Sequence, residues 1–130
     1  MSDIEKKKVL KDLSGDGPIT STGKAKYRIK GNTVHVRFCS TNRVAPAKFK
    51  FNINPNTLSA DFELWVCGSS DCYYLIPTAF LKAIYDNPNT YIDRHHEEIR
   101  VVSVDTATDT VTYATGGQNQ SIRKYRQTKL

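Results

Sequence analysis

The chain has 130 residues, of which 38% are hydrophobic and 25% charged, as in an ordinary soluble globular protein. Its length suffices for one domain with a buried core. No apolar run approaches the roughly 20 residues that a membrane-spanning helix needs, which excludes an integral helical membrane protein. The start of the chain is polar and rich in lysine, unlike a signal peptide. We therefore expect a cytoplasmic protein without a membrane partner, forming a single domain over residues 1–130 with a basic tail from about 116 to 130.

The net charge of +6 is distributed unevenly along the chain. Residues 1–50 carry twelve Lys/Arg against four Asp/Glu, and residues 51–115 carry three against nine. Residues 116–130 add four basic residues and no acids. This asymmetry predicts a basic face, which would attract the phosphate backbone of nucleic acid. The alternative interpretation is that the charged segments only keep the protein soluble.

The first predicted element is a helix over residues 2 to about 13. Ser2, followed by Glu5 three residues later, is typical of a capping box at a helix start. Ser14-Gly15 is expected to end the helix. The apolar stripe of this helix is thin and consists of Ile4, Leu10 and Leu13. The helix is therefore expected at the edge of the core.

A β-hairpin is predicted next, because the hydrophobic period changes to two. Over residues 26–30, Tyr27 and Ile29 alternate with basic residues. Over residues 34–39, apolar positions alternate with polar ones, and Gly31-Asn32 between the two runs is typical of a turn.

The remaining elements follow from shorter apolar runs. Strands are expected at residues 48–53, 62–66, 73–77, 99–104 and 111–115. The run from Phe62 to Val66 is almost continuously apolar, as in a central strand that is covered on both faces. A second helix should begin at Pro77-Thr78, with Phe80, Leu81, Ile84 and Tyr85 on one face. Together these elements predict an α+β or mixed α/β fold, with a central mixed sheet of about five to seven strands and flanking helices.

Three cysteines, Cys39, Cys67 and Cys72, are too few for a disulfide framework. Cys67 and Cys72 flank Gly68–Asp71, which is typical of a hairpin loop, so they can face each other across two strands. They are expected to be reduced in the cytoplasm. Two cysteines at this spacing do not make a zinc site, so we interpret them as small, partly buried residues.

The order of the strands from Thr33 to Pro77 carries a family resemblance. Phe49-Lys50-Phe51 is an aromatic strand, Asp61-Phe62 begins the next strand, and Tyr74-Leu75-Ile76-Pro77 leads into a helix. This layout resembles the PD-(D/E)XK nuclease superfamily over about residues 24–82, which implies a restriction-endonuclease-like fold. In that family, one strand ends with Asp and the next carries an acid, a spacer and a Lys. The two acids hold Mg²⁺, which polarises the phosphate and activates the attacking water.

The catalytic positions of that family are replaced in this chain. His35-Val36-Arg37 occupies the place of the acid-spacer-Lys motif, and the strand over residues 26–30 contains no Asp. The resemblance therefore implies DNA binding without cleavage and without a cofactor. Arg37 can grip a phosphate through two hydrogen bonds, and His35 can add a third. Many members of the family act as dimers, so a homodimer on double-stranded DNA is the expected assembly.

A set of basic residues is predicted to contact the nucleic acid, some along the hairpin and its neighbouring strand and some in an arm formed by the tail. The set consists of Lys26, Arg28, Lys30, His35, Arg37, Arg43, Lys48, Lys50, Arg123, Lys124 and Arg126. For each residue taken alone, an ordinary solvated strand face is the alternative interpretation. For the tail, the alternative is a disordered, solubilising segment.

Two other functions remain open. An active Mg²⁺-dependent DNA endonuclease would need displaced ligands, for which Asp61, Glu63 and Asp16 are candidates. The charged segment over residues 93–98 could also bind a metal or transfer protons. None of these groups has a known motif spacing, so we expect Glu63 to point outward and residues 93–98 to form an exposed loop. The third possibility is a protein-interaction subunit of a larger DNA-processing or defence system.

Overall fold

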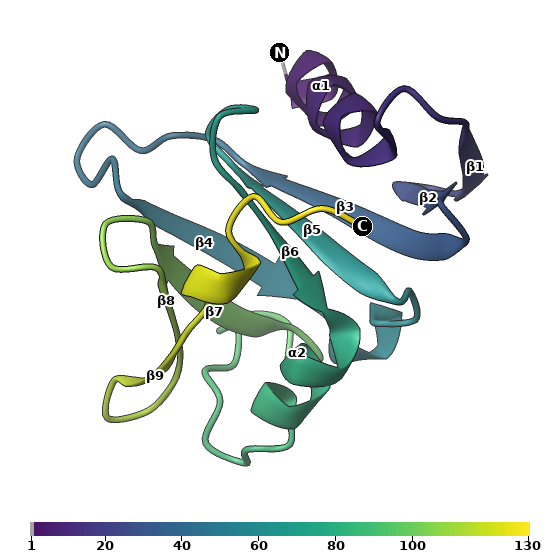
Figure 1. Ribbon diagram of the computed structural model, residues 1–130. Helices are drawn as coiled ribbons and strands as arrows, with labels where there is room; N and C mark the ends of the chain where they lie inside the picture. The colour runs from purple at the N-terminus through teal and green to yellow at the C-terminus, as the bar shows by residue number, and fades with distance from the viewer. Residues whose placement is uncertain (1) are drawn as a thin grey trace.

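The computed structural model describes residues 2–130 and shows an α+β fold (Figure 1). Its α-helices and 3₁₀ helices are α1 (Ser2–Ser14), η1 (Pro55–Thr57), α2 (Thr78–Tyr85) and η2 (Arg123–Tyr125). Its strands are β1 (Ile19–Gly23), β2 (Lys26–Ile29), β3 (Asn32–Cys39), β4 (Lys48–Ile53), β5 (Phe62–Cys67), β6 (Tyr73–Pro77), β7 (Arg100–Asp105), β8 (Thr110–Ala114) and β9 (Gln118–Ser121). Each predicted strand and helix is present, with small shifts at the ends. Strands β1 and β9 were not predicted.

The larger sheet has five strands in the order β1-β2-β3-β5-β6. Neighbouring strands in this sheet are antiparallel, except that β3 and β5 run parallel. In this parallel pair, Val34 lies opposite Phe62 and Cys39 lies opposite Cys67. This parallel pair exists because β4 leaves the sheet between them. The predicted hairpin corresponds to β2 and β3, with Tyr27 opposite Val34.

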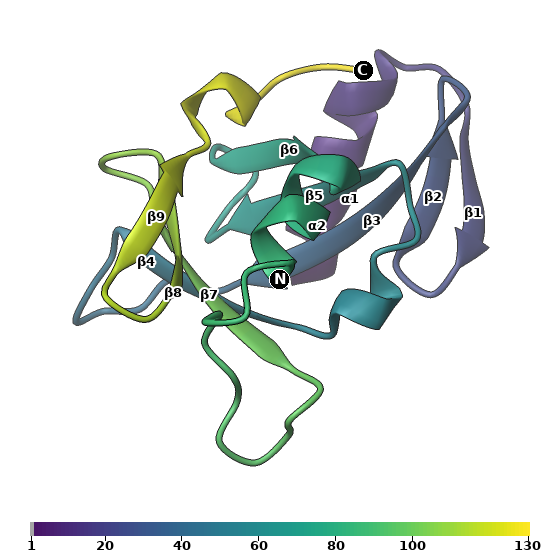
Figure 2. The ribbon, with the colours of Figure 1, turned by 90° about the horizontal axis from the view of Figure 1, so that it is seen from below.

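The second sheet has four antiparallel strands in the order β4-β7-β8-β9. The mixed five-stranded sheet agrees with the predicted α+β fold, whereas this second sheet was not predicted and divides the strands between two layers (Figure 2). Strand β4 pairs with β7, with Lys48 opposite Asp105. Its strict alternation of exposed and buried residues is typical of an outer sheet with one solvent-exposed face.

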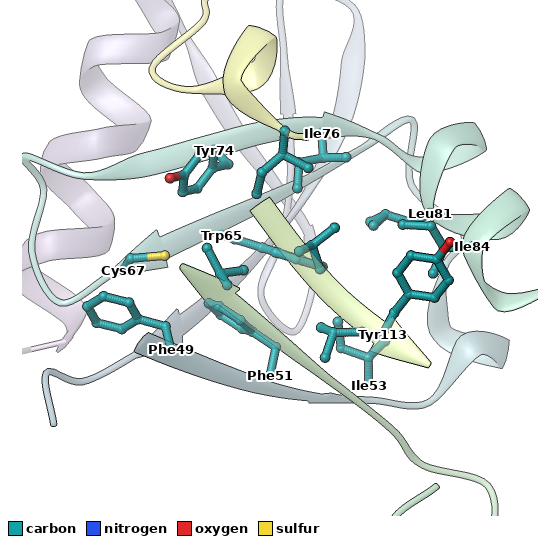
Figure 3. Close-up of a cluster of buried hydrophobic side chains, with 14 of the residues drawn as sticks. Phe49, Phe51, Ile53, Trp65, Cys67, Tyr74, Ile76, Leu81, Ile84 and Tyr113 are labelled. Atoms are coloured by element: carbon teal, nitrogen blue, oxygen red, sulfur yellow. The ribbon is translucent and has the colours of Figure 1, made fainter. Parts of the chain in front are cut away.

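Two apolar clusters cover the two faces of β5. On one face, Leu64 packs in a cluster beneath α1. On the other face, Trp65 packs between the sheets and stacks on Phe51, with 4.8 Å between the ring centroids (Figure 3). The prediction that β5 is a central strand covered on both faces is confirmed.

Helix α1 is anchored by its second half. Val9, Leu10 and Leu13 are buried against the sheet, whereas Ile4 is 57% exposed. Ile4 was therefore wrongly placed in the apolar stripe, and Val9 takes its role. The helix covers one face of the five-stranded sheet rather than only an edge.

Residues 116–130 are packed on the rest of the chain. Strand β9 pairs with β8, and Ile122 is completely buried in the core between the sheets. The backbone N–H of Gln127 donates to the carbonyl oxygen of Tyr73, and Lys129 forms an ion pair with Asp12. This C-terminal segment crosses the molecule toward α1 (Figure 1). The interpretation of the tail as a disordered segment is therefore wrong, because Ile122 and the backbone hydrogen bonds fix it in place.

Across residues 2–130, no helix is long and apolar enough to span a bilayer.

Candidate nucleic-acid interface

Four of the predicted basic side chains share one face of the five-stranded sheet. Lys26 of β2 lies opposite His35 of β3, and Arg28 lies opposite Thr33. Since side chains alternate between faces along a strand, Lys26 and Arg28 lie on the same side as His35 and Arg37. The parallel partner strand places Glu63 beside His35 on this face.

Glu63 is the centre of a polar cluster within this face. Its side chain is completely buried, with 3.2 Å between Oε2 and His35 Nδ1 and 2.5 Å between Oε1 and Arg37 Nε. The indole N–H of Trp65 also donates to Oε1, at 3.3 Å. The expectation that Glu63 points outward is wrong, because these neighbours enclose its carboxylate.

The cluster is closed by elements from outside the sheet. Arg37 Nη2 donates to Thr57 Oγ1 of η1, at 3.0 Å. Tyr85 of α2 brings a buried hydroxyl, which has no hydrogen-bond partner within the described chain. Burial raises the pKa of this hydroxyl to a value well above its ordinary range. Tyr85 is therefore a neutral wall of the cluster.

The ionisation of Glu63 follows from its partners. Burial alone would raise the pKa of this carboxyl, but the hydrogen bonds from His35 and Arg37 and the guanidinium charge together hold it below its ordinary value. Glu63 is thus a carboxylate at neutral pH and compensates the charge of Arg37. Because the Arg37 side chain is only 17% exposed, it is committed to this ion pair and has little capacity to grip a phosphate.

One group of exposed cations without an ion pair lies at the end of the sheet formed by β1 and β2. Lys24 and Arg28 are exposed, and neither forms an ion pair with any residue of the described range 2–130. Lys26 is half-buried and donates to Ser59 Oγ at 2.7 Å, which leaves its charge without a carboxylate. Lys24 was not among the predicted contacts. Its place beside the turn between two strands became recognisable only when β1 was found.

Lys30 lies apart from this group. It occupies the turn between β2 and β3 with a positive φ of 50°, and its Nζ approaches Gly15 at the end of α1. It therefore belongs to the side of the sheet that α1 covers. Lys30 remains exposed but does not extend the face that carries Arg28.

Arg43, Lys48 and Lys50 lie near β4, at the opposite end of the molecule from β1 and β2 (Figure 2). Lys48 forms an ion pair with Asp105 at 2.8 Å. Lys48 and Lys50 line a surface cavity of about 620 Å³ together with Ser103. The expectation that these three residues lie near Lys26 and Arg28 is wrong, because β4 belongs to the second sheet.

The basic residues of the C-terminal segment are mostly engaged within the protein. Arg126 Nη1 donates to Asp109 Oδ1 at 2.8 Å, and Arg123 Nε lies 3.5 Å from Oδ2 of the same carboxylate. The Lys124 ammonium lies 5.2 Å from the ring centroid of Tyr125. Asp109 therefore engages two of the three charges of the predicted cationic arm.

The acidic residues considered for catalysis are not brought together. Asp61 accepts hydrogen bonds from Thr33 N and Oγ1, at 2.9 and 3.1 Å. Glu63 is buried against Arg37, and Asp16 lies beyond α1, 4.0 Å from Lys11. Within residues 2–130, no three His, Cys, Asp or Glu side chains group in a way that could hold a metal ion. These residues do not fit a Mg²⁺ site.

The charged segment over residues 93–98 is an exposed loop, as expected. Asp93 accepts hydrogen bonds from the backbone N–H groups of His95 and His96. These bonds hold the pKa of Asp93 below its ordinary value. The carboxylate shapes the loop and is not directed at a ligand.

No family model, curated protein or solved structure matches this chain. The resemblance to PD-(D/E)XK nucleases therefore rests on the residues alone.

Proposed function

We propose that the protein binds the phosphate backbone of double-stranded DNA without cleaving it, through the β1–β2 end of the five-stranded sheet. The observation that carries this proposal is the group formed by Lys24, Lys26 and Arg28, hereafter the hairpin cations. None of them has a carboxylate partner among the ion pairs of the described residues. Unpaired cations at an exposed sheet end can neutralise phosphates and release their counterions.

The surroundings of the hairpin cations favour a backbone contact. Strand β1 is exposed along its whole length and presents the hydroxyl groups of Thr20, Ser21 and Thr22. Hydroxyl and backbone N–H groups are common donors to phosphate oxygens and fix the position of a protein on a duplex. Asp61 is the nearby acid, and its carboxylate is engaged by Thr33. These hydrogen bonds hold the pKa of Asp61 below its ordinary value, so it stays anionic, and three cations against one carboxylate leave the local charge balance positive.

The buried cluster supports binding rather than hydrolysis. His35 and Arg37 hold the Glu63 carboxylate, so this acid is compensated before any metal could use it. The proposal includes a relationship to restriction-endonuclease-like proteins. It is supported by His35 and Arg37, which lie two positions apart on the same face of β3, and by the direct passage from β6 into α2. In this interpretation the ion pair takes the structural place of a metal centre.

Fluorescence anisotropy with a labelled duplex at two salt concentrations tests the proposal. The double variant Lys26→Ala, Arg28→Ala should bind about tenfold more weakly, with a salt slope shallower by about two. The matched control is Lys82→Ala, Arg94→Ala, which removes the same residue types from exposed positions on α2 and the loop after it. The control should bind as the wild type does.

Three outcomes contradict the proposal. Equal loss of affinity in both double variants would mean that only net charge matters. Binding that does not respond to salt, or no binding of DNA, would favour the protein-interaction alternative. Nicking of plasmid DNA with Mg²⁺ or Mn²⁺ that disappears in Asp61→Asn would restore the nuclease alternative. That variant should be checked for folding by circular dichroism.

A further inference from the structure

Three cysteines lie side by side at one end of the five-stranded sheet. Cys39 of β3 is opposite Cys67 of β5 in the parallel register. Cys67 in turn faces Cys72 across the hairpin, with its backbone N–H 2.9 Å from the Cys72 carbonyl oxygen. All three are free thiols. The adjacent strands thus place one central thiol, Cys67, between two neighbours.

We propose that Cys67 and Cys72 form a peroxide-oxidised thiol pair, in which Cys72 reacts first and Cys67 then closes a disulfide across β5 and β6. The ligand class is a hydroperoxide, with hydrogen peroxide as the simplest member. The inference does not rest on the proposed DNA binding.

The backbone pairing places the two residues opposite each other at the end of the β5–β6 hairpin. Residues that face each other in a hydrogen-bonded antiparallel pair have Cα atoms about 5.5 Å apart. Disulfides span Cα separations of roughly 4.4–6.8 Å. The backbone hydrogen bond between Cys67 and Cys72 places the two thiols on neighbouring strands at the same end of the β5–β6 hairpin.

The two thiols differ in access and in charge. Cys67 is 3% exposed, whereas Cys72 is partly open to solvent. The neighbouring Cys67 thiol and the positive charge of Arg126 lower the pKa of Cys72 to about 7 against the opposing effect of burial. The neighbouring Cys72 and burial raise the pKa of Cys67. Cys72 is thus the nucleophilic thiolate, and Cys67 is the protonated partner.

The reaction balances in two steps. The Cys72 thiolate attacks one oxygen of hydrogen peroxide, the O–O bond breaks, and the products are the Cys72 sulfenic acid and hydroxide. The Cys67 sulfur then attacks the Cys72 sulfur, the S–O bond breaks, and the thiol proton leaves with the hydroxyl group as water. The two sulfur atoms lose two electrons in total, which reduce the peroxide.

Cys39 provides an internal control. It is the parallel neighbour of Cys67 and lines the surface cavity next to Lys48 and Lys50. Its thiol is directed to the carbonyl oxygen of Ser40, at 3.6 Å. Cys67 is therefore not its hydrogen-bond partner. The proposal predicts that Cys39 does not enter the first disulfide.

Mass spectrometry of the full chain after treatment with equimolar hydrogen peroxide tests the inference. Wild type and Cys39→Ser should lose two hydrogens in a step that dithiothreitol reverses, and peptide mapping should join Cys67 to Cys72. Cys67→Ser should instead accumulate a sulfenic acid at Cys72, which dimedone traps. Cys72→Ser should not form a disulfide as fast as the wild type does.

A second measurement does not depend on any variant. At pH 7, iodoacetamide should alkylate Cys72 about threefold to tenfold faster in the folded chain than in the urea-unfolded chain. The larger thiolate fraction outweighs the lower nucleophilicity of a more acidic thiol. A first disulfide that contains Cys39, a disulfide between two chains, or a folded-state rate below the unfolded one would overturn the proposal.

Discussion

Glu63 and Arg37 form a buried ion pair between the parallel strands β5 and β3, with 2.5 Å between Oε1 and Nε. Each strand contributes one charge that is largely removed from water, and each charge is compensated by the other. A slip of one residue between the strands would carry Arg37 to the face that packs beneath α1. The two charges therefore compensate each other only in the observed register of β3 and β5, which is the only parallel strand pair in residues 2–130.

Removing one partner of this pair should be strongly destabilising. Arg37→Ala leaves the Glu63 carboxylate buried without its main cation, so the free energy of unfolding should fall by about 3–5 kcal/mol. Urea denaturation followed by circular dichroism measures this change. Arg43→Ala, at an exposed position, is the control and should change stability by less than about 0.5 kcal/mol.

The double variant Arg37→Met, Glu63→Leu separates charge burial from packing. It removes both charges together and should recover most of the stability that Arg37→Ala loses. If Arg37→Ala unfolds at the same urea concentration as the wild type, the ion pair does not hold the two strands in solution.

The lowered pKa of Glu63 predicts a pH dependence of stability with a definite sign. Because the folded-state pKa lies below the ordinary value of 4.5, the contribution of Glu63 is fully present above that pH. It is lost as the pH falls through the folded-state value, where the carboxyl becomes protonated. Glu63→Gln should therefore be less stable than the wild type at neutral pH, and the difference should shrink in acid.

Thermal unfolding at neutral pH and through the acid range checks this prediction. Several other carboxyl groups also have lowered pKa values, so only the difference between variant and wild type reports on Glu63. Glu97→Gln, in the exposed loop, is the matched control and should follow the wild-type curve. A constant difference between Glu63→Gln and the wild type at every pH would show that Glu63 does not titrate below its ordinary range.

The sequence predicted the elements that are set by local patterns. The β2–β3 hairpin followed from alternation around Gly31-Asn32, and β5 followed from a continuous apolar run. Strands β1 and β9 were missed because they are exposed and contain at most one apolar residue, Ile19 in β1, so they have no hydrophobic period to detect. They form strands only because their backbone groups hydrogen-bond to a neighbouring strand.

The features that decide the candidate site depend on contacts between distant residues. The burial of Glu63 is caused by Arg37, which is 26 positions away, and alternation alone gave no reason to place both inside. The second sheet depends on the pairing of β4 with β7, for which no local pattern exists. The predicted basic residues remain a set of expected nucleic-acid contacts. Their division between two ends of the molecule required the strand order.

Trp65 should be the most important single side chain of the core between the sheets. It is completely buried, stacks on Phe51 and donates its indole N–H to Glu63. Trp65→Ala should lower the free energy of unfolding by about 3–5 kcal/mol, because it leaves a large cavity. Trp65→Phe keeps the stacking and should cost less. A normal midpoint of urea denaturation for Trp65→Ala would contradict the position of Trp65 in the core.

The C-terminal segment should detach locally when its ion pair with Asp109 is removed. Asp109 accepts hydrogen bonds from Tyr74 Oη at 2.6 Å and from Arg126 Nη1 at 2.8 Å, and Arg126 also donates to the carbonyl oxygen of Thr106. Arg126→Ala should lower stability by about 1–3 kcal/mol, since two partly buried hydrogen bonds lose their charged donor.

Hydrogen exchange locates this effect. The backbone N–H of Gln127 donates to Tyr73, so its protection should fall in Arg126→Ala, whereas the N–H groups of β5 should keep theirs. Lys124→Ala, at an exposed position two residues earlier, is the control and should leave the protection of Gln127 unchanged. Equal protection of Gln127 in wild type and Arg126→Ala would mean that Ile122 alone anchors the segment.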